Sequence, residues 1–354
     1  MVQAVVPAPA VGKELARAKS KMLLRSKWFL VLMPLAAVIV SLFIGNYQAD
    51  AATIVSLLLS KLKLSSGGDF AVNLETAIFQ VRLPRIFMAL LVGMSLSVSG
   101  AVFQGVFRNP LVSDHILGVS NGASLGAAAA ILWGASIVGV QLAAFMSGML
   151  AVGLTYSISR IYKTTSTLTL VLSGIIVGGF FSALISLLKS IADPLDKMPA
   201  IVFWLMGSFA KISSVDLKFA VPIMVSALFV LWLVRWRLNI LAVGEEDAKS
   251  LGMNTEAFRF SLVVLCTLAT SSAVAVSGVI GWVGLVVPHV ARILVGPDHK
   301  DLIPLSISLG GTYMVLMDDL ARSLTTAEVS IGILTAIIGA PFFAYLLRKG
   351  TSWS

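Results

Sequence analysis

Long apolar runs, separated by short polar or charged segments, recur along the chain from residue 28 to its end. Many of these runs approach the 20 residues that a helix needs to cross the hydrocarbon core of a bilayer. Because lipid offers the backbone no hydrogen-bond partners, such runs form helices rather than open strands. The pattern therefore predicts an all-α integral membrane protein with about ten transmembrane helices.

The expected spans have approximate bounds 28–45, 82–106, 115–133, 138–157, 168–188, 219–234, 260–278, 279–295, 302–317 and 331–347. Residues 51–62 are too short and too mixed in polarity to cross, so we expect a surface helix there. Residues 199–210 are apolar but also too short, which predicts an interfacial segment with Trp204 as an anchor.

The first 27 residues form a basic tail, and residues 28–354 form the ten-helix domain. Lysine and arginine gather in alternate loops, which predicts a multi-pass protein of the cytoplasmic (inner) membrane with both termini in the cytoplasm. A cleaved secretory signal is the competing interpretation, since Ala49-Asp50-Ala51 has the small-x-small form of a cleavage site. The long basic leader and the many later spans favour a retained first helix.

Composition supports this class and excludes several functions. Of the 354 residues 58% are hydrophobic and 12% are charged, whereas soluble domains carry about 25% charged residues. The net charge of +9 is explained by basic residues beside the spans, so nucleic acid is not an expected partner. The single cysteine, Cys266, and three scattered histidines match no metal site, and no GxxxxGK[ST] phosphate loop occurs. We expect no catalytic residues, metal or cofactor in this chain.

The segment 235–259 differs from the rest, because eight of its 25 residues are charged. Within it, residues 244–252 predict a short helix with three acids in the first turn, Lys249 in the last turn and Gly252 as its end. Ala248 and Leu251 would share one face. Two interpretations stay open at this point: a handle for a partner, or an amphipathic loop on the headgroups.

Glycines recur on one face of two spans. Gly118, Gly122 and Gly126 are spaced by four residues in one span, and Gly174 and Gly178 in another. Such stripes allow close helix packing in membranes.

An internal repeat predicts a transporter plan. Val98-Ser99-Gly100, Pro110 and Gly118 match Val276-Ser277-Gly278, Pro288 and Gly296 at an offset of 178 residues, and Ile175-Ile176 and Phe180-Phe181 match Ile337-Ile338 and Phe342-Phe343 at an offset of 162. Five spans per half would make the halves inverted, as in many transporters. A channel or an intramembrane enzyme is the rival class. The scarcity of buried ionisable residues argues against an enzyme and against ion-coupled transport.

Several motifs are spaced along the chain: Arg82-Leu83-Pro84-Arg85, Arg108-Asn109-Pro110-Leu111, the stretch 116–123 (ILGVSNGA), 284–289 (GLVVPH) with Ala291-Arg292, 332–335 (GILT), 339–343 (GAPFF) and the helix at 244–252. Together they resemble the permeases that import iron-siderophores, haem and cobalamin. The likeness runs in the right order from about residue 80 to the end of the chain.

The resemblance implies a type II ABC importer permease with an inverted five-helix repeat. Its partners would be two ABC ATPase subunits that bind ATP and magnesium, a second permease subunit (homodimer or related heterodimer), an extracytoplasmic substrate-binding protein and the lipid bilayer. The residues of 235–259 expected to couple to the ATPase are Gly244, Glu245, Glu246, Ala248, Leu251 and Gly252.

Arg82, Arg85 and Arg322 match the family positions that accept acids of the binding protein. Anchoring of helix ends at the headgroups is the alternative, and Asp318 and Asp319 could pair with Arg322 instead. Ferric siderophore is the expected cargo, ahead of haem, cobalamin and molybdate-type oxyanions. A stand-alone secondary transporter or channel is the alternative of a different class.

Overall fold

The computed structural model describes residues 27–45, 50–61, 72–113, 115–160, 167–325 and 327–348. Within these ranges the secondary structure is helical, without strands. Most of the basic tail and Ala49 of the candidate cleavage site lie outside the described residues. The elements are α2 (Lys27–Phe43), α3 (Ala51–Lys61), α4 (Val72–Glu75), the π-helix η1 (Thr76–Arg82), α5 (Leu83–Val106), α6 (Val119–Leu132), α7 (Ile137–Ser159), α8 (Thr167–Ile191), α9 (Lys197–Leu205), α10 (Ser214–Val243), α11 (Glu245–Ser250), α12 (Thr255–Ser277), α13 (Val283–Val295), α14 (His299–Ser323) and α15 (Ile331–Arg348).

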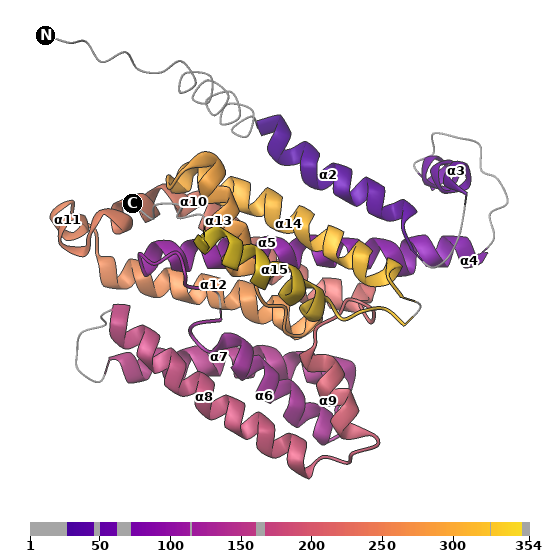
Figure 1. Ribbon diagram of the computed structural model, residues 1–354, viewed down its shortest axis with the longest axis horizontal. Coiled ribbons are helices and arrows are strands. Elements are labelled where there is room, and N and C mark those ends of the chain that lie inside the picture. Colours follow the sequence, from indigo (N-terminus) through magenta and orange to yellow (C-terminus); the bar gives the residue numbers. More distant parts are fainter. Residues whose placement is uncertain are drawn as a thin grey trace, which may run out of the picture.

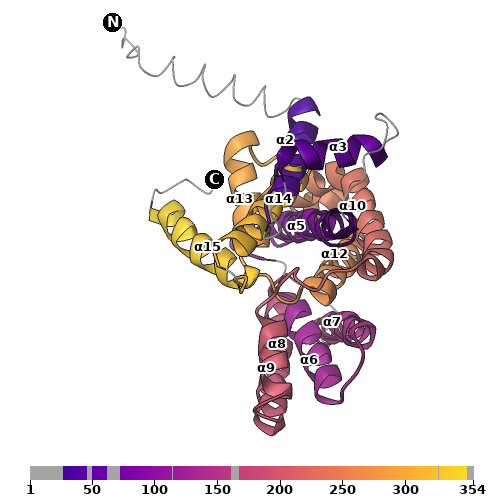
Figure 2. The ribbon, with the colours of Figure 1, turned by 90° about the vertical axis from the view of Figure 1, so that its right-hand side faces the viewer.

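Two groups of helices make up the molecule. Figures 1 and 2 show α6, α7, α8 and α9 together on one side, while α2, α5, α10, α12, α13 and α14 form the larger group. Helix α5 lies at the centre of the larger group and contacts α2, α10, α12, α13 and α14. Most of its side chains are buried, which explains why its residues are apolar or small on every face apart from Arg85 and Gln104.

Glycines let two helices approach α5 closely. A Cβ at Gly93 would overlap the backbone of Gly310 in α14, and a Cβ at Gly100 would overlap the backbone of Gly284 in α13. Such contacts between backbones allow dense packing in a membrane, where apolar burial alone gives little drive for helices to associate.

Length and composition agree with the predicted spans, with some corrections at their ends. Five segments are long and apolar enough to cross a membrane: residues 72–106, α7, α8, α10 and α12. Helices α2, α6, α13 and α15 are apolar but shorter. Helix α14 has 25 residues, and it continues past the expected end at 317, so that Asp318, Asp319 and Arg322 lie in its last turns rather than in a loop.

Two spans begin later than expected because of left-handed residues. Gly118, with φ of 81°, precedes α6, and Trp282, with φ of 71°, precedes α13. The predicted spans from 115 and 279 are therefore wrong at their starts. Residues 115–117, before α6, form a turn, and residues 279–281, before α13, are not helical.

The same two residues correct the alignment of the repeat. Helices α5 to α8 have 24, 14, 23 and 25 residues, and α12 to α15 have 23, 13, 25 and 18. Gly118 and Trp282, each at the start of the short helix, lie 164 residues apart, close to the offset of 162. The offset of 178 instead pairs Gly118 with Gly296, which follows the end of α13. The matches at 178 are thus not equivalent positions, whereas the helix order supports the repeat.

Candidate functional site

Helix α11 lies at one end of the bundle, called here the α11 end (Figure 1). The amide of Ala248 donates to the carbonyl of Gly244 at 3.0 Å, and the amide of Met253 donates to the carbonyl of Ala248 at 3.0 Å. Gly252 has φ of 78°, a left-handed conformation that glycine adopts without strain. The predicted short helix and its glycine end are confirmed, with bounds one or two residues inside those expected.

The faces of α11 differ from the expected arrangement. Ala248 is fully buried, whereas Leu251 is 73% exposed. The expectation that these two residues share one face is wrong, because Leu251 follows the helix end and turns outward. Glu246 and Asp247 are also exposed. The surface that α11 presents to solvent therefore carries these two acids and Lys249, whose side chain is 62% exposed, with an apolar side chain at its edge.

Glu245 points back into the protein rather than outward. Its carboxylate accepts from Nη2 of Arg259 at 3.1 Å and from the hydroxyl of Thr255 at 3.4 Å. Lys249 lies 3.4 Å away on the same helix. Burial raises the pKa of Glu245, but hydrogen bonds and charge from Arg259 and Lys249 outweigh burial, so the pKa lies below its usual value. The ion pair ties α11 to the first turns of α12.

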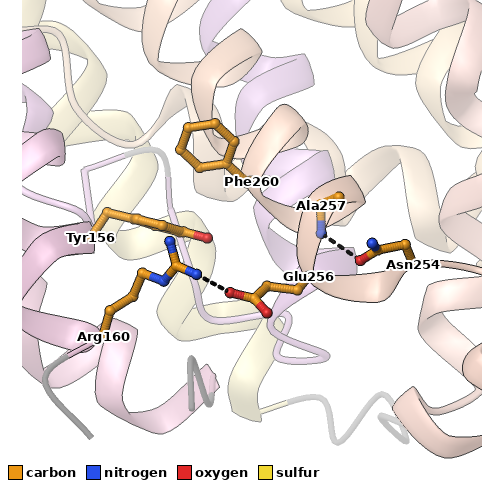
Figure 3. A pocket seen from close by; sticks show the side chains of 6 residues that line it. All are labelled: Tyr156, Arg160, Asn254, Glu256, Ala257 and Phe260. Atoms are coloured by element: carbon orange, nitrogen blue, oxygen red, sulfur yellow. Dashed lines mark hydrogen bonds and ion pairs between the residues drawn. The ribbon is translucent and has the colours of Figure 1, made fainter. Parts of the chain in front are cut away.

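A pocket of about 220 Å³ lies beside this junction, between the end of α7 and the start of α12 (Figure 3). Nη2 of Arg160 donates to Glu256 at 2.8 Å, and the guanidinium also lies over the ring of Tyr156. The rings of Tyr156 and Phe260 are 5.0 Å apart between centroids. Both charged side chains are more than half exposed, so the aromatic contact is the firmer link between α7 and α12.

The other end of the bundle holds the three arginines that were expected to face a binding protein, and it is called here the arginine end. Arg85 is 5% exposed. Its Nε and Nη2 donate to Asp318 at 2.8–3.0 Å, and its Nη1 donates to Glu328 at 3.0 Å. All three guanidinium nitrogens of Arg85 are thus engaged by acids of the same chain.

Arg322 and Arg82 are enclosed in a similar way. Arg322, 4% exposed, forms ion pairs with Asp318 and Asp319. Arg82, 5% exposed, donates from Nη1 to the carbonyl of Leu42 at 2.8 Å. The alternative that Arg322 pairs with its neighbouring aspartates is confirmed. In this conformation the three arginines do not present free guanidinium groups to a partner.

The chain matches the FecCD transport family over residues 32–349. It belongs to that family. Consistent with this, it is 43% identical to the molybdate import system permease protein MolB of Haemophilus influenzae, over 90% of this chain and 94% of that protein. It is also 43% identical to the cobalamin import system permease protein BtuC of Halobacterium salinarum, over 76% of this chain and 72% of that protein.

A solved structure gives the same result for the fold. It shows an inward-facing conformation of an ABC transporter that is provisionally assigned to the metal-chelate type. It is 41% identical to this chain and superposes with a TM-score of 0.81, covering 91% of this chain and 98% of that one. The chain is thus an all-helical, multi-pass permease subunit of the ABC importer class, with the type II fold that the motifs indicated.

The expected packing glycines of this FecCD permease lie between α6, α7 and α8. A Cβ at Gly122 or Gly126 would overlap α7, and a Cβ at Gly174 would overlap the backbone of Ile116. Gly178 lies against Asn121, whose side chain donates to its carbonyl at 3.0 Å. Gly118 differs, since it lies at the turn that starts α6 rather than within the helix.

Sequence reasoning missed Arg259 and Glu328. A signal for Arg259 was present, because it lies three and seven residues before Leu262 and Cys266, both fully buried, and so on the apolar face of α12. No comparable signal existed for Glu328, which has φ of 55° in the connection between α14 and α15. Its contact with Arg85 joins residues 243 positions apart.

Proposed function

We propose that this permease works as half of a membrane pathway driven by two ABC ATPase subunits that dock at the α11 end. The observation that carries the proposal is α11 itself, a short charged helix at the end of an apolar bundle (Figure 1). A chain without a phosphate loop needs a partner to hydrolyse ATP. The exposed Glu246, Asp247 and Leu251 would meet a cleft with basic residues at its rim and an apolar floor.

Charge distribution supports a cytoplasmic position for the α11 end. Arg160, Arg235, Arg237 and Lys300 lie near helix ends on this side, and basic residues favour the cytoplasmic face. The first described turn of α2 and the last turn of α15 also point toward this end in Figure 1. The proposal therefore places both termini in the cytoplasm of a cell whose inner membrane holds the protein.

The α11 contact can be tested by replacing Leu251 with glutamate and measuring how much ATPase subunit co-purifies with the tagged permease. Leu195 is the matched control, since it is 93% exposed and belongs to the connection between α8 and α9. That connection lies far from α11 (Figure 1). If Leu251 is a central contact, L251E lowers recovery of the ATPase roughly tenfold, and L195E leaves it unchanged. Equal recovery with both variants would remove α11 as the docking element.

A second permease subunit would pack on α8 and α15. Both helices carry large exposed apolar residues at helical spacing: Leu172, Ile175, Ile176 and Phe180 on α8, and Ile333, Ile337, Ile338 and Phe342 on α15. Lipid can cover such faces, so pairing is tested by disulfide cross-linking of Ile176→Cys and, separately, Ile337→Cys in membranes. A homodimer gives cross-linked dimers of the tagged chain alone, whereas a heterodimer gives a product that contains a related permease.

A substrate-binding protein would dock at the arginine end. Since Arg85 is held by Glu328, which is 27% exposed at its side chain, docking there requires acids of the partner to replace this internal carboxylate. The exchange keeps the buried guanidinium paired throughout, which avoids the cost of an isolated buried charge.

The proposed cargo is a metal chelate, with ferric siderophore first, because the motifs resemble siderophore permeases. Molybdate is the second candidate, favoured by the match to MolB across 94% of that protein. Uptake of labelled ferric siderophore and labelled molybdate by cells with and without the gene separates them. Dependence of either on the partner ATPase, and not on an ion gradient, supports the importer and excludes a stand-alone secondary transporter or channel.

A further inference from the structure

Helix α11 contacts α10 and α12. Helix α12 in turn contacts α10 and α5 in the larger group, and α7 and α6 in the smaller group. Figure 1 shows α12 along the boundary between the two groups. A displacement of α12 would therefore change its contacts with both groups of helices.

The covalent connection between α11 and α12 is a short turn of residues 251–254. It passes through Gly252, whose φ of 78° places it in a left-handed turn, and no atom lies within 4 Å of where its Cβ would be. The next residues lead to Asn254, which caps α12 by accepting from the amide of Ala257 at 3.0 Å. A short turn joins the two helices at one point only, so a second connection decides whether α11 and α12 move as a unit.

The ion pair between Glu245 and Arg259 is that second connection. The side chain of Arg259 is 4% exposed, whereas that of Glu245 is 36% exposed. A buried guanidinium without a counter-charge is strongly unfavourable, so this contact resists separation far more than an exposed pair does. The hydroxyl of Thr255 adds a hydrogen bond from the first turn of α12.

The start of α12 is in turn linked to α7. Glu256 pairs with Arg160, and the ring of Phe260 packs on Tyr156 (Figure 3). Helix α7 contacts α6 and α8. A continuous set of side-chain contacts therefore runs from α11 through the first two turns of α12 to the smaller group of helices.

We propose that Arg259 is the positioning residue that makes α11 and α12 move together, so that displacement of α11 by an ATPase subunit is passed through Phe260 and Tyr156 to the α6–α9 group. The inference rests on the proposed docking of the ATPase at α11. Arg259 takes no part in docking itself, because its side chain is 4% exposed. The exposed residues of α11 and its C-cap are Glu246, Asp247, Lys249, Ser250 and Leu251.

The test uses the full transporter, reconstituted with its ATPase and binding protein in liposomes. Arg259→Met removes the charge and keeps the length of the side chain, and Glu245→Gln removes the opposite charge. In each, cargo transported per ATP hydrolysed falls roughly tenfold, the scale of a typical coupling free energy, while the ATPase subunit co-purifies as in the parent. The double variant E245R/R259E, in which the two charges are exchanged, restores most of the cargo transported per ATP hydrolysed, as expected for two groups that act as a unit.

A distance measurement separates transmission from a merely structural role. Nitroxide labels on Ser250→Cys in α11 and Ser157→Cys in α7, both exposed positions, are compared with and without ATP in a Cys266→Ala background. The parent keeps one narrow distance in both states, because the two helices move together. Arg259→Met gives a broadened distance that changes when ATP binds.

The outcomes also distinguish failure of this inference from failure of the docking proposal. An unchanged transport ratio in Arg259→Met, or an unchanged label distance, overturns the role of Arg259. Loss of the ATPase subunit from Arg259→Met also overturns it, since Arg259 would then only shape the docking surface. Normal ATPase recovery in L251E overturns docking at α11 instead, whatever the Arg259 variants do.

Discussion

The two ends of this permease use charge in opposite ways. At the α11 end, Glu246 and Asp247 face solvent, and Arg259 is buried with a partner. At the arginine end, Arg85 and Arg322 are enclosed with Asp318 and Asp319. The first arrangement leaves a surface for another protein to bind, whereas in the second the internal ion pairs stabilise the fold. Charged residues near span ends can thus have either role, and burial decides which.

The largest expected effect is at the arginine end. Asp318→Asn leaves Arg85 and Arg322 without their shared counter-charge, and breaking a buried ion pair costs about 3–5 kcal/mol. We expect a matching decrease in the free energy of unfolding, measured by denaturant titration in detergent micelles.

Glu256→Gln at the α11 end is the control for that measurement. It breaks an ion pair with Arg160 in which both side chains are more than half exposed, so its effect should stay within about 0.5 kcal/mol. Equal effects of the two variants would show that the arginine end is open to water and would remove the contrast between the ends.

A smaller effect is expected at Glu328. Glu328→Gln removes one of the two acids that contact Arg85 but keeps a hydrogen-bond acceptor. We therefore expect the free energy of unfolding to change by about 1 kcal/mol. If acids of the partner replace this carboxylate, Glu328→Gln should bind the substrate-binding protein more tightly than the parent does in low salt. The affinity is measured as binding of that protein to the reconstituted transporter. Glu75→Gln, which breaks the exposed pair with Lys61, is the matched control. A lower affinity in Glu328→Gln would mean that Glu328 itself helps to dock the partner.

An effect of similar size, but confined to α11 and its neighbours, is expected at Gly252. Gly252→Ala forces a side chain into a left-handed turn at a cost of about 1 kcal/mol. Because space around the position is open, we expect only faster amide hydrogen exchange in residues 243–254, roughly fivefold. Gly153→Ala, at an open position within α7, should leave exchange in α11 unchanged. Global unfolding in Gly252→Ala would contradict a local effect.

The sequence alone determined the class, the order of the apolar helices and a short helix within residues 244–252. These follow from local properties: the length of apolar runs, the placement of acids and a lysine along one helix, and a glycine at its end. The repeat was visible too, but its register was not, because chance matches are frequent in apolar sequence. The register of the repeat follows from the N-caps of α6 and α13, which are Gly118 and Trp282.

Tertiary structure alone decided which charges are partnered within the chain. Arg85 meets Asp318 and Glu328 across more than 230 residues, and Glu245 meets Arg259 around a turn. Whether an arginine near a span end faces a partner, a headgroup or an internal acid depends on which helices pack beside it. That packing depends on close backbone contacts such as the one between Gly93 in α5 and Gly310 in α14. A sequence pattern that repeats within one helix does not indicate which other helices pack against it.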